Sequence, residues 1–226
     1  MKKWIVGGTA GLLILTVSAA YAGSMSYSVL NVLDKKVTQA IVVTTEKPES
    51  FKAKLTLYER SGKSLKWQPV IENIPAVIGK NGLAAFGQKQ EGDGKTPQGL
   101  FPLGPAFGDA PEVKTGLEYR QATDKDLWVD DPASPQYNTW VSGEPQAKSF
   151  EQLKRKDDLY KYAMIIQYNT EAPVAGAGSA IFLHVWRGPK QPTSGCVAVA
   201  EKSIVQLLER LDRNRQPVIL LSLSNE

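Results

Sequence analysis

The chain of 226 residues contains one cysteine and one histidine, and its net charge is small. A single cysteine cannot form an intramolecular disulfide, so the thiol is either buried and inert, paired between chains, or a working group. One histidine and one cysteine cannot supply a structural zinc site without unusual help from carboxylates, so we expect neither a metal nor another cofactor. The formal charge of +4 is too weak and too evenly spread to indicate a nucleic-acid partner.

The chain begins with a pattern typical of a secretory signal. Lys2 and Lys3 precede an uncharged, mostly apolar stretch at 4–17, and the small-x-small sequence Ala-Tyr-Ala follows at 20–22. We therefore predict a signal peptide at 1–22, export to the periplasm, and no stable membrane insertion after cleavage. A retained anchor is the alternative, but the apolar stretch is shorter than the ~20 residues of a spanning helix. Cleavage would leave 25 basic and 23 acidic residues, a balance of +2.

The remainder is predicted to hold a short lead-in at 23–38 and one domain at 39–226, because no repeat or low-complexity linker divides it. Alternating or β-branched apolar runs predict most of the elements as strands. Two prolines in the third run favour edge strands there. The fold class is therefore mainly β, a sandwich or barrel with one or two short helices. The expected strands are 39–45, 51–58 and 67–78, which form an antiparallel meander, then 161–168, 181–186 and 218–223, and the expected helix is 201–213.

Two central segments look irregular. Eight glycines and three prolines in 79–108 predict tight turns instead of regular structure. Little regular structure is expected in 109–145, where Trp128, Tyr137 and Trp140 either line a substrate groove or pack against the sheet. Ser149 and Gln152 have the spacing of a capping box, which predicts a short helix running to about residue 158.

The candidate chemistry lies in 181–200. His184 falls in an alternating apolar run, and Cys196 follows a turn signal twelve residues later. A thiolate is a strong nucleophile, and a neighbouring imidazole is the usual group that generates it near neutral pH. The alternative is a buried, inert cysteine and a core histidine with satisfied hydrogen bonds.

These residues carry a resemblance to a known family. His184 followed by Thr193-Ser194-Gly195-Cys196-Val197 resembles the catalytic signature of the YkuD-like L,D-transpeptidases, in the branch without accessory domains. The blocks 79–83, 91–99 and 181–188 resemble that branch as well, and the likeness spans roughly 39–223.

The resemblance implies a cysteine acyltransferase whose partners are peptidoglycan stem peptides. Cys196 would cleave the diaminopimelate–D-alanine bond of a tetrapeptide donor through a thioester and form 3→3 cross-links. His184 would act as the acid–base group, oriented by a backbone carbonyl. The backbone N–H groups of Gly195 and Cys196 would form the oxyanion hole, and Thr193, Ser194 and Trp186 would contact the substrate.

Two departures from the family pattern leave alternatives open. Ser194 stands where many members have a second histidine, and Ala198 stands where they have an arginine. Arg187 either supplies the missing substrate-binding charge or is a solvated strand end. Water in place of an amine would make the protein an L,D-carboxypeptidase, and a wall amidase or a non-catalytic wall-binding protein remains possible. Oligomeric state is not readable from the sequence.

Overall fold

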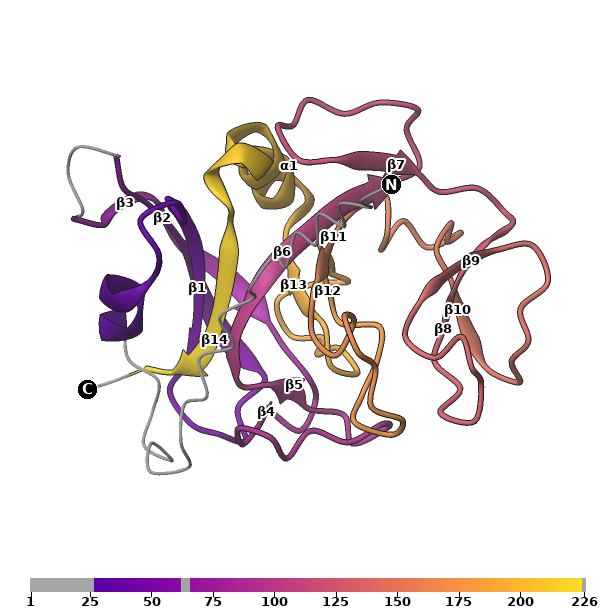
Figure 1. Cartoon of the computed structure of the whole chain (residues 1–226). Coiled ribbons are helices and arrows are strands. Elements are labelled where there is room, and N and C mark those ends of the chain that lie inside the picture. Colours follow the sequence, from indigo (N-terminus) through magenta and orange to yellow (C-terminus); the bar gives the residue numbers. More distant parts are fainter. Residues whose placement is uncertain (1–26, 62–65, 225–226) are drawn as a thin grey trace, which may run out of the picture.

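The computed structural model describes residues 27–61 and 66–224, and its centre is a sheet that closes on itself (Figure 1). Pairing between β11 and β6 joins the two ends of a run of eight strands into a barrel, and β7 (Tyr119–Gln121) extends β6 outside that ring. This confirms the mainly β, barrel-like prediction. The order around the barrel is β11 (Tyr162–Ile166), β12 (Phe182–Val185), β13 (Val197–Val199), β3 (Gln68–Val77), β2 (Lys52–Glu59), β1 (Gln39–Thr45), β14 (Val218–Leu223) and β6 (Gly99–Gly108).

The barrel interior follows directly from period-two patterning. In β2, Ala53, Leu55 and Leu57 are buried, while Lys52 and Lys54 are exposed and Thr56 is partly exposed. The same alternation in the other strands fills the barrel with aliphatic side chains, and the apolar side of α1 (Glu201–Arg210) adds Ile204, Leu207 and Leu208. The predicted helix is therefore present, although it ends three residues earlier than expected.

The predicted meander is confirmed, and its third strand is an edge along most of its length. β1 pairs with β2 and β2 with β3, both antiparallel, and β3 also pairs with β13. The edge prediction from Pro69 and Pro75 holds for residues 68–75, which pair with β2 alone, and fails only at Ala76 and Val77, where β13 pairs with the other side of β3. Both prolines fall outside that short ladder, so their missing N–H groups break none of its hydrogen bonds.

The prediction of tight turns holds for only part of the glycine-rich region. β4 (Leu83–Ala84) and β5 (Thr96–Pro97) are two-residue strands, but β6 is a ten-residue strand. β6 pairs with β14 through Pro102 and with β11 from Leu103 onward. Glycine and proline are common where a strand bends at a barrel corner, so here they accompany a change of strand partner instead of a loop.

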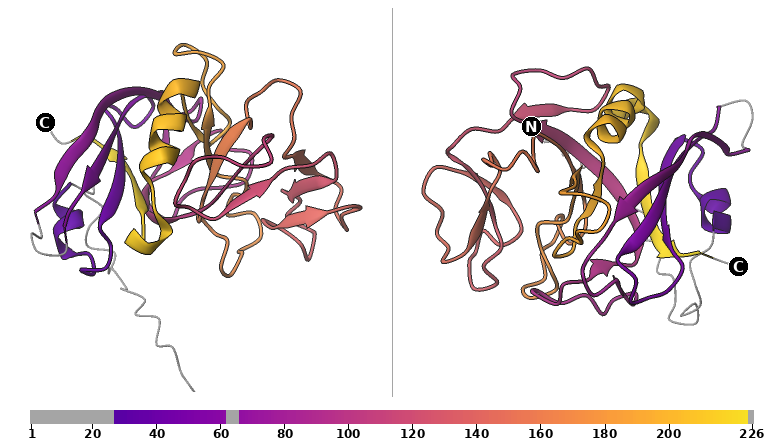
Figure 2. Two further views of the ribbon diagram at one scale, coloured as in Figure 1. Left: turned by 90° about the horizontal axis from the view of Figure 1, so that it is seen from above. Right: turned by 180° about the vertical axis from the view of Figure 1, so that it is seen from behind.

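Residues 109–160 form a lobe beside the barrel (Figures 1 and 2). Its three-stranded sheet has the order β10 (Phe150–Gln152), β8 (Asp126–Val129), β9 (Trp140–Ser142), so the expectation of little regular structure was wrong there. The predicted helix after Ser149 was also wrong. Ser149 Oγ donates to Asp130 Oδ1, and Phe150 pairs with Val129, so pairing with β8 overrides the local capping pattern.

A second layer of apolar residues covers another part of the barrel. In the lead-in, η1 (Tyr27–Val32) is a 3₁₀ helix that places the fully buried Leu30 against Ala40, Val42 and Leu220. At the other end of the chain, η2 (Arg213–Arg215) connects α1 to β14. The signal predicted at 1–22 lies outside the described residues.

Candidate active site

Strand alternation places the candidate residues on the outer face of the barrel. β12 and β13 run parallel, with Leu183 opposite Val197 and His184 opposite Ala198. The inner-face residues join the barrel core, whereas Phe182 and Cys196 belong to a separate cluster shared with the lobe. The inner face of this strand pair therefore belongs to the barrel core, and the outer face carries Cys196 and His184.

Cys196 lies immediately before β13 and is only 8% exposed. Its thiol donates to Ala180 O at 3.2 Å and its Sγ accepts from Phe182 N–H at 3.4 Å. Ala180 has a left-handed φ of 52° and is held from the lobe, because its N–H donates to Asn138 Oδ1. Strained backbone of this kind is typical of functional sites.

His184 is buried in β12, and its Nδ1 lies 2.7 Å from Val185 O. A carbonyl only accepts, so Nδ1 carries the hydrogen and Nε2 keeps the lone pair of the neutral ring. Val185 O thus has the place of the backbone carbonyl that the family resemblance implies. Within the described ranges no hydrogen bond joins the His184 ring to Sγ, whose partners are Ala180 and Phe182.

Burial sets the resting charge of both groups. It lowers the pKa of His184 to about 4, with the Val185 hydrogen bond acting in the opposite direction. Burial, and next the Glu151 carboxylate, raise the pKa of Cys196 to about 12. Near neutral pH the resting site therefore holds a neutral thiol and a neutral imidazole, and not a preformed ion pair.

The lobe covers this outer face with aromatic and acidic groups. The Tyr160 ring meets the His184 ring edge-on at 5.2 Å and the Phe182 ring at 5.5 Å. Its hydroxyl donates to Glu151 Oε2 on β10. Burial raises the pKa of Glu151, while the Tyr160 hydrogen bond opposes that shift. Sequence patterns did not identify Glu151 or Tyr160, since neither belongs to a local motif.

The loop before Cys196 is fixed by two threonines. Thr193 Oγ1 donates to Cys196 O at 2.6 Å and accepts from Gly195 N–H at 3.1 Å. Thr96, buried in β5, donates to Gly195 O at 2.7 Å. Thr96 belongs to the block at 91–99 that carried part of the family resemblance, and its contact shows how that distant segment supports the loop before Cys196.

The other predicted site residues, Arg187, Trp186 and Ser194, are more exposed to solvent than His184 and Cys196. Arg187 is exposed and pairs with Asp157 at 2.8 Å, and Asp157 also pairs with Arg155 at 2.7 Å. These contacts lower the pKa of Asp157 to about 2, chiefly through Arg155. Trp186 is partly exposed and Ser194 is exposed, at the two ends of the loop that joins β12 to β13.

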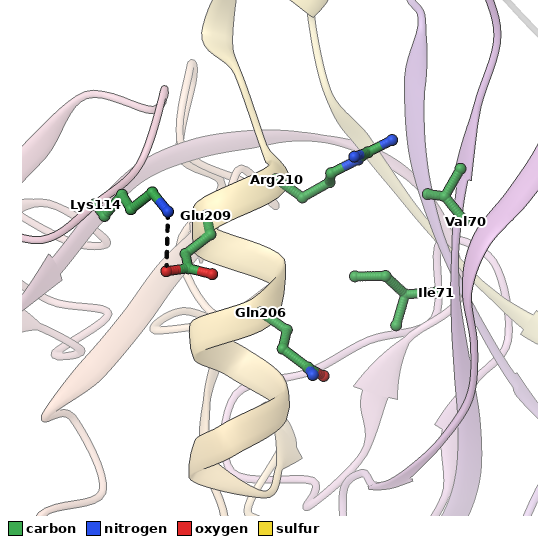
Figure 3. Close-up of a pocket in the computed structure, with 6 residues that line it drawn as sticks. All are labelled: Val70, Ile71, Lys114, Gln206, Glu209 and Arg210. Carbon is green, nitrogen blue, oxygen red and sulfur yellow. Dashed lines mark ion pairs between the residues drawn. The ribbon is translucent and has the colours of Figure 1, made fainter.

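Other parts of the described chain offer no competing site. Among residues 27–61 and 66–224, no group of three or more His, Cys, Asp or Glu side chains could hold a metal ion. A groove of about 670 Å³ between β3 and α1 (Figure 3) is lined, among the described residues, by no cysteine, serine, threonine or histidine, and its lining includes one ion pair, between Lys114 and Glu209. No helix in the described ranges is long and apolar enough to span a membrane.

Comparison with known proteins agrees with this geometry. Neither the curated proteins nor the solved structures yielded a significant match. The family model for the L,D-transpeptidase catalytic domain, YkuD, matches residues 40–220, which include the barrel strands, the lobe, His184 and Cys196. The chain belongs to the YkuD family of L,D-transpeptidase catalytic domains.

Proposed function

We propose that this L,D-transpeptidase-type enzyme of peptidoglycan uses Cys196 as its nucleophile and His184 as its acid–base group. The observation that carries this proposal is the placement of the chain's one cysteine and one histidine on the same outer face of two paired strands. Neither side chain is needed to fill the barrel, because Leu183, Val185 and Val197 do so from the opposite face.

The reaction begins from the neutral pair. His184 Nε2 takes the proton of Cys196 Sγ as the sulfur attacks the carbonyl at the L-centre of diaminopimelate in a tetrapeptide stem. A C–S bond forms, and the electron pair of the carbonyl moves to oxygen. The tetrahedral intermediate then collapses to a thioester, the C–N bond breaks, and His184 returns the proton to the nitrogen of departing D-alanine.

An oxyanion hole formed by the backbone N–H groups of Gly195 and Cys196 would stabilise the intermediate, with each donor worth about 3 kcal/mol. In the resting structure Gly195 N–H donates to Thr193 Oγ1. Thr193 therefore holds the donor in place and must release it when negative charge develops on the substrate oxygen. Thr193, Ser194 and Trp186 lie on the loop that borders this point.

The second half-reaction decides the class of enzyme. Attack on the thioester by the side-chain amine of a second diaminopimelate gives a 3→3 cross-link, which is the activity we propose. Attack by water gives an L,D-carboxypeptidase with the same two residues. Ala198 cannot replace the missing arginine, so we assign the charge that meets the substrate carboxylate to Arg187, which is 54% exposed beside the site.

Export to the periplasm belongs to the same proposal. Its support is the basic, apolar and small-residue pattern at 1–22, and the substrate class, which lies outside the cytoplasmic membrane. Mass measurement of the protein recovered from cells tests it: a chain beginning at Gly23 is expected, and a full-length chain would contradict cleavage.

The decisive experiment incubates the exported protein, wild type and Cys196→Ala, with purified disaccharide-tetrapeptide and follows protein and products by mass spectrometry. We expect a covalent adduct on the wild type, loss of D-alanine and a dimeric product. Tripeptide monomer alone would assign the carboxypeptidase, and release of a wall-attached peptide would assign the amidase. No adduct and no turnover, with an unreactive Cys196, would leave a wall-binding protein that keeps the fold.

A further inference from the structure

A buried lysine approaches the nucleophile loop from the glycine-rich segment. Lys89 lies between β4 and β5, and its side chain is only 4% exposed. Lysine is almost never buried to this extent unless it is paired. Its partner is Asp93, whose Oδ1 lies 2.7 Å from Nζ, and Nζ also donates to Gln90 O at 2.7 Å.

The side chain passes between two glycines. A Cβ placed on Gly178 would lie 2.9 Å from Lys89 Cγ and 3.3 Å from Nζ, so a larger residue at 178 would displace the lysine. A Cβ placed on Gly195 would lie 3.9 Å from Lys89 Cε. The last methylene of Lys89, Cε, is therefore close to the residue that precedes Cys196, and the ammonium group is one bond further along the side chain.

The Lys89–Asp93 pair is itself firmly held. Burial raises the pKa of Asp93. Hydrogen bonds from Lys89 and from the N–H groups of Gln90 and Lys95 outweigh that effect and keep the pKa of Asp93 below its usual range. An ammonium has three donors, and two of them have acceptors in the described part of the chain, Asp93 and Gln90. The arrangement fixes the position of a positive charge and leaves one donor uncommitted.

We propose that Lys89 is a positioning residue for the acyl-transfer site, where its buried ammonium favours negative charge on Cys196 and on the adjacent oxyanion. This inference rests on the proposed function of Cys196. The anionic form of the thiol needs such a charge because the resting imidazole is neutral. Asp93 serves to orient Lys89 and to allow its burial.

The two cations near Cys196 act on its thiol in the direction that this role requires. Lys89 and Arg155 lower the pKa of the Cys196 thiol, whereas burial and Glu151 raise it. Tyr160 and His184 are the other titratable groups on this face. Of the two cations, Arg155 is engaged with Asp157 and partly exposed, so solvent screens it more than Lys89, which is almost fully buried.

Alkylation of Cys196 in the full chain tests the proposal without requiring turnover. Rates with iodoacetamide and with the bulkier N-ethylmaleimide are measured from about pH 7 to 10 in wild type, Lys89→Met and Lys89→Arg. We expect Lys89→Met to slow both reagents by the same factor, about tenfold at each pH, and Lys89→Arg to recover most of the rate. Lys190→Met is the matched control, since Lys190 is exposed on the loop between His184 and Cys196.

Lys89→Met removes the cation that pairs with Asp93, so Lys89→Met with Asp93→Asn provides a second variant without a partly buried carboxylate that lacks a counter-charge. The slower alkylation is expected in this double variant too, with a melting temperature close to that of wild type. Unchanged alkylation in a folded variant, or effects that differ between the two reagents, would overturn the proposal. A wild-type Cys196 that forms no adduct with disaccharide-tetrapeptide would instead refute the proposed function, so the two failures are distinguishable.

Discussion

The two faces of the β12–β13 strand pair have different roles, although their residues alternate along the same few positions. Leu183 and Val185 point into a closed aliphatic barrel, whereas Phe182 and His184 meet the aromatic residues of the lobe. The inner face carries aliphatic side chains, whereas the outer face combines an aromatic ring, an imidazole and a thiol. The outer-face side chains of this strand pair can therefore be held firmly, because the other face is anchored in the core.

The largest effect is expected from the outer face. Cys196→Ala should reduce turnover of a tetrapeptide stem by at least about a thousandfold, because no other thiol exists in the chain. The free energy of unfolding should change by less than about 1.5 kcal/mol, since cysteine behaves as a small hydrophobe there. Product assays and urea denaturation measure the two quantities, and a large loss of stability would mean that Cys196 is structural.

The inner face should give the opposite result. Leu183→Ala removes a fully buried side chain from the barrel, so we expect unfolding to become easier by about 2–5 kcal/mol. Urea denaturation measures this cost. In the fraction that stays folded, Cys196 should still react with iodoacetamide at nearly the wild-type rate. Loss of that reactivity would show that the two faces are not separable.

Acid should destabilise the protein through His184. Its pKa is about 4 in the folded chain and about 6.5 when unfolded, so between these values the unfolded state binds the additional proton. Stability attributable to His184 is therefore complete above about pH 6.5 and falls as the pH drops toward 4, by about 3 kcal/mol in total. The free energy of unfolding of His184→Gln, measured at both ends of this pH range, should lack the pH-dependent contribution of His184. The same pH dependence in His184→Gln as in wild type would refute this assignment.

The lobe opposes ionisation of the thiol, and that contribution can be tested separately. Glu151→Gln should speed alkylation of Cys196 several-fold near pH 8, because it removes a charge that raises the thiol pKa. Glutamine can still accept the Tyr160 hydrogen bond. Glu171→Gln, on an exposed turn, is the control. A slower reaction in Glu151→Gln would indicate that the carboxylate orients the site.

The smallest stability effect should come from Arg187. Its ion pair with Asp157 is exposed, so Arg187→Ala should change the free energy of unfolding by at most about 1 kcal/mol. If Arg187 meets a substrate carboxylate, KM for the tetrapeptide should rise while alkylation of Cys196 is unchanged. An unaltered KM would leave Arg187 as a solvated strand end.

Local patterns predicted the elements whose periodicity was strong and failed where pairing partners were distant. The run 218–223 matches β14 residue for residue, and the spacing of Ile204, Leu207 and Leu208 correctly predicted α1. The capping box at Ser149 failed because β8, twenty residues earlier in the chain, offers a pairing edge. Glycine and proline content likewise concealed β6, whose partners β11 and β14 are remote in sequence.

The sequence by itself determined the candidate nucleophile and its imidazole, because a single cysteine and a single histidine at short spacing leave few choices of chemistry. It also determined which face of each strand is apolar, since that depends on period two alone. Tertiary structure alone decided the closure of the barrel, the cover supplied by Tyr160 and Glu151, and the approach of Lys89 to Gly195. These features set the resting charge of the site, and they depend on burial and on contacts between residues far apart in the chain, which no local pattern encodes.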